Sequence, residues 1–369
     1  MIRTLLSIIF CISLGAVSAN TLRVVDDKDN VPLASAAVFS ESGLIIGLTD
    51  KNGEIEIKSD AYYPITVKCT GYAPTQCDAG ITTAFMQQIP IKLSEVVVTP
   101  DGRPVIRMIF YTREYFTGVN ETDTVIEITE SMQDFFIPAK EKLKGFKKSK
   151  ALRTLSTRVY RWRKDDKGKD TVTMSNRMIS SSDNIVDFSP KISKKDKKKV
   201  RSGNGTDTIP GKYSPKMLIR RNPEDSSVFV RYDMLADNKN HMASPNFLKL
   251  LGMTIDMSES LLTGRYDDNG KDAEVFPIEN MQFMSLSLNM LMKGKLYKSM
   301  YNSDSPIRSI LYEEIYPVGR EYLTVEEANV LKNYTSLNCD IKASDDAGPI
   351  DAAYQRIIDR YNDEHSDTK

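Results

Sequence analysis

Gly47-Leu48-Thr49-Asp50-Lys51-Asn52-Gly53-Glu54-Ile55-Glu56-Ile57 is the stretch that decides the fold of the N-terminal part. Its centre, 50–53, is a strong turn signal, because Asp and Asn side chains bond to nearby backbone groups and glycine adopts positive φ without steric cost. Ile55 and Ile57 alternate with glutamates, which places both on one face of a strand. The stretch therefore predicts a tight β-hairpin.

Short apolar or alternating runs continue on both sides of this hairpin, separated by turn residues. The runs predicted as strands are 22–25, 35–39, 44–48, 54–58, 65–69 and 89–98. About six or seven short strands at such regular spacing are typical of a sandwich. Residues 20–99 are therefore predicted to form an all-β sandwich, the first domain of the mature chain.

A series of short motifs runs through this region in a fixed order: Val25-Asp26, Pro32-Leu33, Ala36-Ala37-Val38, Gly47-Leu48-Thr49-Asp50, Asn52-Gly53, Gly71-Tyr72 and Leu93. This series resembles the carboxypeptidase regulatory-like domain, with Ile55 as a departure where that family commonly has an aromatic residue. The resemblance implies a seven-stranded prealbumin-like sandwich that serves binding or spacing. Such domains occur in Gram-negative envelope proteins, often ahead of TonB-dependent receptors.

Residues 1–19 have the three parts of a secretory signal peptide. Arg3 supplies the positive start, 5–14 the apolar stretch, and 17–19 the residues before a cut. The apolar stretch is shorter than the roughly 20 residues that span a bilayer. An uncleaved anchor and lipid attachment at Cys11 are the alternatives. We expect an exported protein, periplasmic or associated with the outer membrane of a Gram-negative bacterium, with no transmembrane segment after signal cleavage.

The charges of the chain balance, with 50 Lys and Arg against 50 Asp and Glu. A balanced chain gives no electrostatic reason to expect nucleic acid or an anionic membrane as a partner. Hydrophobic residues make up 40% and charged residues 27% of the sequence, which is ordinary for a globular protein. Composition therefore indicates a folded protein and leaves its partner open.

Three cysteines remain once the signal peptide is removed. Cys69 and Cys77 are close in sequence, while Cys339 is distant. Export permits a disulfide between Cys69 and Cys77 if they lie on adjacent strands. Free buried thiols are the equal alternative, and one cysteine is left over in either case. None of these spacings matches a zinc framework.

The longer region, 100–369, matches no family motif, and its pattern predicts a β-rich α+β fold. The runs predicted as strands are 125–128, 151–164, 171–179, 228–232, 284–292, 296–301 and 308–316. A capping box at Thr324-Val325-Glu326-Glu327 predicts a short helix. Pro349 precedes apolar residues at helical spacing, which predicts a second helix whose apolar face packs on this protein.

Between these predicted elements, residues 191–208 lose apolar character and read as a mobile basic loop. The run Lys194-Lys195-Asp196-Lys197-Lys198-Lys199 is compatible with binding phosphate or an acidic glycan, although a solvated loop is the commoner meaning. Trp162 and the surrounding tyrosines suit stacking on sugars, but aromatic residues in strands are more often part of a core.

The search for chemistry predicts no catalytic, cofactor-binding or metal-ligating residue. The two histidines, His241 and His365, are not near any motif for a triad or a zinc site. The stretch 266–272 holds oxygen ligands around a glycine but lacks the closing glutamate of a calcium loop, so a plain turn is favoured. Other acidic residues of this area are Asp233, Asp237, Asp256, Glu259, Asp267 and Asp268.

Three functions stay open, and no cofactor is expected for the leading one. That one is a non-catalytic exported envelope protein whose β-sandwich is a binding or docking module, for a glycan or an outer-membrane partner. The second is a hydrolase with an unrecognised carboxylate pair in the C-terminal region, which needs two acids facing one cleft. The third is a periplasmic accessory of outer-membrane transport, which needs an exposed sheet edge or apolar groove.

Overall fold

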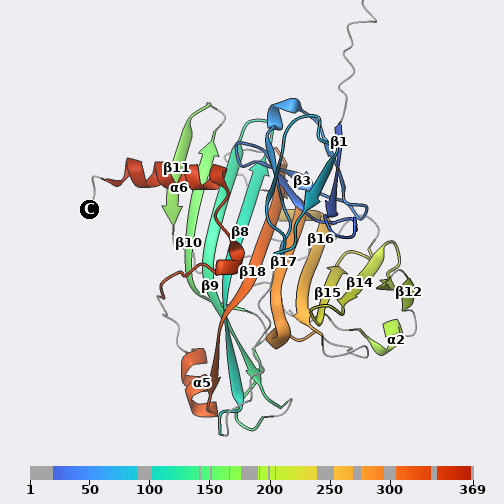
Figure 1. The fold of residues 1–369 in the computed structure, drawn as a ribbon. Helices are drawn as coiled ribbons and strands as arrows, with labels where there is room; N and C mark the ends of the chain where they lie inside the picture. The colour runs from blue at the N-terminus through green and yellow to red at the C-terminus, as the bar shows by residue number, and fades with distance from the viewer. Residues whose placement is uncertain are drawn as a thin grey trace, which may run out of the picture. The chain divides into compact units, whose positions relative to one another are not determined.

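The computed structural model divides the chain into two compact units, Met1–Gln88 and Ile89–Lys369. Each unit is described by itself below, and Figure 1 gives the labels of the elements. The predicted signal peptide and the predicted strand after residue 89 lie outside the described residues. These are 20–89, 102–140, 143–149, 152–165, 167–175, 190, 192–197, 200–203, 205–238, 253–268, 276–294, 305–333 and 339–366.

The small unit consists of a three-stranded and a four-stranded sheet. The first has the order β4-β1-β7, in which β7 runs parallel to β1, and the second has the order β3-β2-β5-β6. Its elements are β1 (Asn20–Asp26), β2 (Ala37–Phe39), β3 (Ile45–Leu48), β4 (Glu54–Ile57), η1 (Asp60–Tyr62), β5 (Ile65–Lys68), β6 (Thr75–Cys77) and β7 (Thr83–Met86).

One hydrophobic core joins the two sheets, because alternate residues of strands from both sheets belong to it. Leu22 and Val24 of β1 meet Val38 of β2 and Val67 of β5 there. The prediction of an all-β first unit is confirmed at the level of these two packed sheets. β6 and β7 are the last strands described in this unit. The strand expected at 89–98 is not tested, because residues 90–98 are not described.

The turn predicted at 50–53 is present, but it is not a hairpin. β3 and β4 on either side of it belong to different sheets, so the chain crosses the core at this point. Asp50 Oδ1 accepts hydrogen bonds from the backbone N–H of Asn52 at 2.8 Å and of Glu54 at 2.9 Å. Thr49 Oγ1 donates to the Leu33 carbonyl at 2.6 Å. Local sequence predicts the turn, while the sheet that each strand joins is decided by packing.

Two motifs of the series, Val25-Asp26 and Gly71-Tyr72, contact each other in the small unit. The Tyr72 hydroxyl donates to Asp26 Oδ2 at 2.8 Å, and Gln88 Nε2 donates to the same oxygen at 2.6 Å. Asp26 is buried, so these bonds offset the cost of removing its carboxylate from water. Cys69 and Cys77 are buried in the same core and are not joined to each other in this structure, and a disulfide between them remains a prediction.

The large unit is built on an eleven-stranded antiparallel sheet with the order β11-β10-β9-β8-β18-β17-β16-β15-β14-β13-β12. Neighbours in the sheet are neighbours in sequence except at the pair β8 and β18. The strands are β8 (Val105–Val119), β9 (Thr124–Pro138), β10 (Arg153–Lys164), β11 (Asp170–Ser175), β12 (Arg201–Gly203), β13 (Thr206–Pro210), β14 (Pro215–Asn222), β15 (Ser227–Asp233), β16 (Met253–Asp267), β17 (Met281–Gly294) and β18 (Ile307–Leu323).

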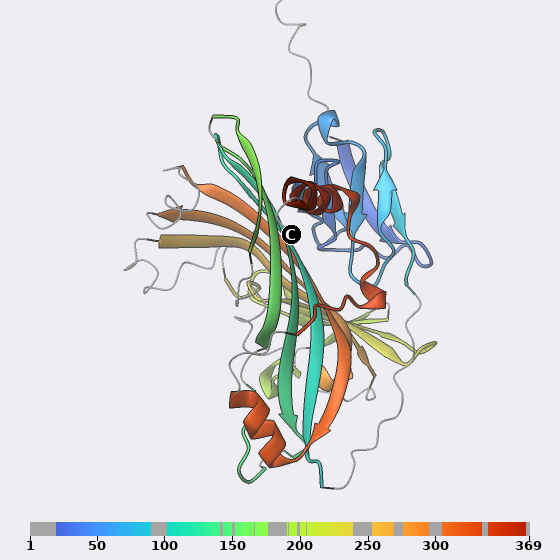
Figure 2. The same ribbon diagram turned by 90° about the vertical axis from the view of Figure 1, so that its left-hand side faces the viewer.

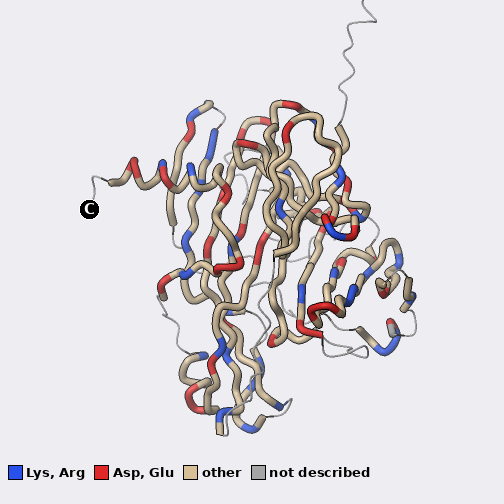
Figure 3. Tube along the Cα trace, viewed as in Figure 1, with Lys and Arg blue, Asp and Glu red and all other residues tan. Residues whose placement is uncertain are grey.

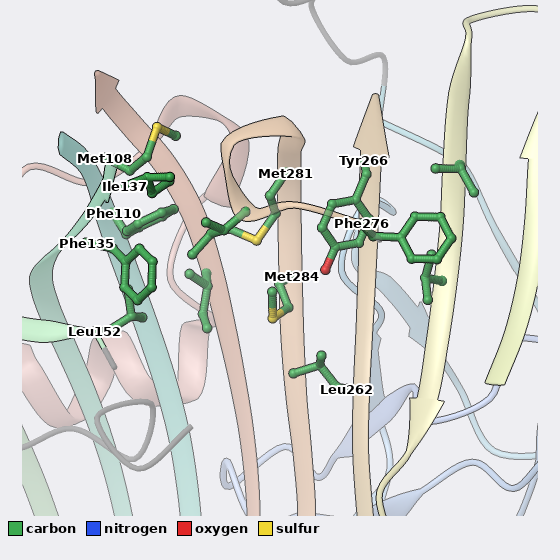
Figure 4. Packing of buried hydrophobic residues seen from close by; sticks show 14 of the residues in the cluster. Met108, Phe110, Phe135, Ile137, Leu152, Leu262, Tyr266, Phe276, Met281 and Met284 are labelled. Atoms are coloured by element: carbon green, nitrogen blue, oxygen red, sulfur yellow. The ribbon is translucent and has the colours of Figure 1, made fainter. Parts of the chain in front are cut away.

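The face of the large sheet that carries the main core cluster is called the inner face. The main core cluster joins Phe110 and Phe135, from β8 and β9, to Ile219 and Val230, from β14 and β15. Ile315, Met284 and Leu262 of the strands between them belong to the same cluster, which thus runs across the sheet. Figure 2 shows the bend of the long strands, and Figure 4 shows part of the cluster between them.

The opposite face, called the outer face, carries Tyr111, Arg113 and Tyr115 of β8. It is covered in part by the C-terminal segment with η4 (Asp345–Ala347) and α6 (Ala352–Glu364), and α6 contacts β10 and β11. The remaining helices of the described chain are α2 (Lys194–Lys197), η3 (Ile278–Asn280) and α5 (Val325–Asn333).

Both predicted helices are confirmed. Thr324 Oγ1 accepts from the Glu327 N–H at 3.2 Å, and Glu327 Oε2 accepts from the Thr324 N–H at 2.9 Å, which is the predicted capping box at the start of α5. In α6, Tyr354, Ile357 and Ile358 are buried against this chain, as expected. Among the described residues no helix is long and apolar enough to cross a membrane.

The predicted strands 125–128, 151–164, 171–179, 228–232, 284–292 and 308–316 correspond to β9, β10, β11, β15, β17 and β18, whereas 296–301 lies outside the described residues. The expected loop at 191–208 instead contains α2, β12 and the start of β13, because Gly205 adopts φ 71° and turns the chain into a short hairpin. β8, β14 and β16 were not predicted.

Candidate functional site

Three hydroxyl groups form a row across the inner face of the large sheet. Thr157 of β10 is directly opposite Ser131 of β9, and Ser131 is directly opposite Thr112 of β8. Their exposed fractions are 3%, 0% and 1%. No hydrogen-bond partner is found for any of the three oxygens in the structure. A buried hydroxyl without a partner costs about 1–3 kcal/mol, so three in a row require an explanation.

The next row on the same face carries carboxylates. Glu114 of β8 lies directly opposite Thr129 of β9 on one side and Glu313 of β18 on the other. Glu313 is fully buried, and Glu114 is partly exposed. Like charges directly opposite each other on a sheet are destabilising. We call the two rows together, Thr157, Ser131, Thr112, Thr129, Glu114 and Glu313, the polar band.

Along β8, apolar residues border the polar band on both sides. Phe110, two residues before Thr112, belongs to the main core cluster. Phe116, two residues after Glu114, packs against a smaller cluster of Val125, Met292 and Ile307. Next to the band, on β10 at the side of the sheet beyond β9, Arg161 pairs with Glu127 at 2.8 Å. Its side chain is 32% exposed, so solvent reaches the inner face there. Along β9 the buried polar residues Gln133 and Glu127 lie at its two ends, so the band is part of a longer polar stretch of this strand.

The outer face carries a row of charged residues of alternating sign. In register across four strands lie Arg158, Glu130, Arg113 and Glu314. Arg158 Nη2 donates to Glu130 Oε2 at 2.8 Å, and the Tyr111 hydroxyl donates to Glu130 Oε1 at 2.5 Å. Residues of both signs are interspersed along these strands (Figure 3).

The Tyr111 hydroxyl also links two members of this row, Glu130 and Arg113. Burial, and then the neighbouring Glu130 carboxylate, raise the pKa of the Tyr111 hydroxyl well above its ordinary value, so it remains a hydrogen-bond donor. Arg113 Nε donates to the same hydroxyl oxygen at 3.0 Å. Arg113 Nη1 donates to the carbonyls of Ala347 and Gly348, each at 3.1 Å. The row thus fastens the C-terminal segment to the sheet.

A second charged row on the outer face fastens α5. Asp134, with a side chain that is 0% exposed, accepts from Arg107 Nε at 2.8 Å and from Arg153 Nη2 at 2.6 Å. Arg153 Nη1 donates to the carbonyls of Leu331 and Lys332 at the end of α5, at 2.6 and 3.0 Å. Cations favour the C-terminal end of a helix. This row is therefore a structural clamp.

Tyrosines of the outer face, which the sequence offered as sugar-stacking residues, pack on α6. The rings of Tyr115 and Tyr354 meet edge to face with centroids 4.8 Å apart, and those of Tyr160 and Tyr361 at 5.6 Å. His365 stacks on Tyr361 at 4.3 Å. The interpretation of such aromatic residues as core holds for Tyr160.

The acidic residues singled out in the sequence are spread over the β15–β17 region. Asp233 accepts from Ser214 Oγ at 2.7 Å, and Asp267 from Gln282 Nε2 at 2.7 Å. Asp237 accepts from the Lys212 N–H at 3.0 Å, and Asp268 lies 3.4 Å from Arg221 Nε. Within the described parts of the chain, no group of three or more His, Cys, Asp or Glu could hold a metal ion. Asp256 and Glu259 lie on β16. His241 and 269–272 lie outside the described residues.

Sequence reasoning missed the polar band. The signal is present in β8, where Phe110, Thr112, Glu114 and Phe116 alternate with Tyr111, Arg113 and Tyr115. With polar groups on both faces, this pattern lacks the apolar-polar alternation that identified the other strands. The contributions of β9, β10 and β18 depend on register, which no local pattern specifies.

Comparison with known proteins adds no family. No family model matches this chain, and no curated protein matches it. Two solved structures are weakly similar: a putative AttH from Nitrosomonas europaea (11% identity, 64% of this chain, 58% of that chain, TM-score 0.17) and OprB from Pseudomonas putida at low pH (8% identity, 58% of this chain, 93% of that chain, TM-score 0.18). This chain therefore spans little more than half the length of the AttH protein.

Proposed function

We propose that this chain is a non-catalytic, exported protein of the cell envelope that binds a molecule of its surroundings through the polar band. The observation that carries the proposal is the row of Thr157, Ser131 and Thr112, three buried hydroxyls for which no partner is found in the structure. Ligand sites include a few converging polar groups that fix the orientation of the ligand, and the band would supply such groups. Export is inferred from the signal-like N-terminus.

The small unit is proposed to be a prealbumin-like sandwich of the carboxypeptidase regulatory-like kind, acting as a docking module. Its two sheets around one core support this proposal. The bond between Tyr72 and Asp26 supports it further, because it links two separate pieces of the motif series. In this arrangement the large unit binds, and the small unit attaches the protein to an envelope partner.

Affinity capture from the native envelope tests the proposal. The mature protein serves as bait beside a band variant with Thr112→Val, Ser131→Ala and Thr157→Val. Thr263→Val is the matched control, because Thr263 is also buried and its hydroxyl has no partner in the structure, but it lies in the outer-face row of Ser285 and Glu314. We expect wild type and control to retain an envelope component that the band variant loses. Identical capture by all three would contradict the proposal.

The hydrolase alternative has one observation in its favour, the direct opposition of Glu114 and Glu313. Antiparallel neighbours have Cα atoms about 4.5–5.5 Å apart, so the two side chains start close together on one face, as a pair of catalytic carboxylates requires. Incubation with envelope glycans, followed by measurement of new reducing ends, tests this alternative. A hydrolase requires activity that Glu313→Gln removes, whereas the binding function predicts no release by either protein.

A further inference from the structure

The two edges of the large sheet are protected to different degrees. β12, at one edge, has only three residues, among them Arg201 and Gly203, and α2, which contacts β13, adds the exposed Lys194 and Lys195. Short strands and lysines are features that keep an edge strand from pairing with another chain. β11, at the other edge, has six residues. We infer that β11 is a docking site for an extended segment of a partner protein, which adds to the sheet as a further strand.

β11 has no lysine, and its composition suits pairing on both sides. Residues 171–175 are Thr-Val-Thr-Met-Ser, a run without proline, glycine or a charge, and β-branched residues are enriched in strands. The charged residue of β11, Asp170, already pairs with Arg360 of α6 at 2.9 Å. β10 pairs with β11 on one side, and no strand in the described part of the chain pairs with it on the other. Backbone N–H and C=O groups of alternate residues therefore point away from the sheet, which makes this edge a template for a further strand.

α6 converts this edge into a slot. The helix lies on the outer face, contacts β10 and β11, and extends past β11 at its C-terminal end (Figure 1). Tyr361 of that end packs on Tyr160 of β10, with ring centroids 5.6 Å apart, and His365 stacks on Tyr361 at 4.3 Å. A strand added to β11 would lie about 4.8 Å beyond it. Its outer side would therefore face the end of α6 and the rings of Tyr361 and His365.

The slot is open to solvent, and its two sides differ in character. Met174, on the outer side, is 37% exposed, and Thr173 and Ser175, on the inner side, are exposed as well. When a peptide adds to a sheet edge, its backbone hydrogen bonds supply affinity and its alternate side chains supply specificity. Side chains of the added strand that point outward would meet Met174 and the stacked rings of Tyr361 and His365, whereas those that point inward would meet hydroxyl groups. The partner segment should therefore alternate apolar and polar residues.

Hydrogen exchange with mass spectrometry on the mature full-length protein tests the inference. The probe is the peptide acetyl-KVTLTVK-amide, which alternates apolar and polar residues. Its control carries N-methyl groups on the five central residues, which removes the hydrogen-bond donors from both backbone edges while keeping the side chains. We expect the probe to bind with a Kd below about 1 mM and to slow amide exchange within 170–175. The N-methylated control should do neither.

A charge placed in the slot should weaken this binding. Met174→Lys puts an ammonium group where the apolar side chains of the probe would lie, so we expect the Kd to rise at least about tenfold. Ser202→Lys, which adds the same charge to the exposed edge strand β12, is the matched control and should leave the Kd unchanged. Both positions are exposed, so both variants should unfold at the wild-type temperature.

Four results would each overturn the inference. Three concern binding: no binding of the probe, equal binding of the N-methylated control, or an unchanged Kd in Met174→Lys. The fourth is slow exchange of 171–175 in the free protein that the probe does not alter, because the chain itself would then already cover this edge. The inference does not depend on the polar band, so either proposal can fail without the other.

Discussion

At the scale of single residues, the crossing between the two sheets of the small unit depends on Gly53. Its φ is 74°, in the left-handed region that residues with a Cβ rarely adopt. A Cβ at this position would lie 2.4 Å from the Val24 carbonyl oxygen and 3.1 Å from the Leu33 nitrogen. Both contacts are to backbone, which cannot move aside as a flexible side chain would.

Gly53→Ala should therefore destabilise the small unit more than an ordinary substitution in a turn. The left-handed backbone costs about 1–2 kcal/mol for a residue with a Cβ. The contact with Val24 adds an overpacking cost of about 1–3 kcal/mol. Gly80→Ala is the matched control, because Gly80 has φ 90° but no atom within 4 Å of its Cβ position. Urea unfolding followed by circular dichroism measures both, and equal losses in the two variants would refute the steric argument.

At the scale of elements, Arg113 connects the C-terminal segment to the centre of the large sheet. Its guanidinium is buried and donates to the Ala347, Gly348 and Pro349 carbonyls, which precede α6. Arginine suits this role because its planar group presents several donors in a fixed geometry. α6 adds edge-to-face ring contacts with the sheet. The sequence of α6 alone does not predict the hydrogen bonds that Arg113 makes to the residues before it.

Arg113→Met should loosen the C-terminal segment, because the three carbonyls lose their shared donor and nearby carboxylates lose a cation. Removing one partner of a buried charged network costs about 3–5 kcal/mol. Hydrogen exchange with mass spectrometry should show faster exchange over 345–360 than in wild type. Arg103→Met is the control, since Arg103 is 44% exposed in its pair with Glu327 and surface pairs contribute about 0–1 kcal/mol. Unchanged exchange in Arg113→Met would refute the anchoring role.

The elements also show which parts of the fold a sequence can predict. Met284, Leu286 and Leu288 alternate, and that pattern alone indicated β17 despite the helical preference of Leu and Met. β16 was missed, because Leu261 and Leu262 are adjacent and both buried, which removes the alternation. Strands covered on both faces lose the period of two on which such predictions depend.

At the scale of the whole chain, the candidate site could not be predicted, because register assembles it. Thr112, Ser131 and Thr157 come from consecutive strands, but Glu313 arrives through the pairing of β18 with β8, about 200 residues apart in sequence. The pairing register of β10, β9, β8 and β18 alone places these groups side by side on one face. The series of short strands predicted a first domain over 20–99, and the first compact unit of the structure is Met1–Gln88.

That division predicts that the two cores respond separately to mutation. Ile65 and Met284 are both 0% exposed, one in the core of the small unit and the other in the main cluster of the large sheet. Truncation of either to alanine removes about 2–5 kcal/mol from the core that contains it. Calorimetry of the mature full-length protein should show Ile65→Ala lowering one transition and Met284→Ala lowering another, each leaving the other in place. A single transition lowered by both variants would mean that the units unfold as one, because substitutions in independent cores affect only their own unfolding.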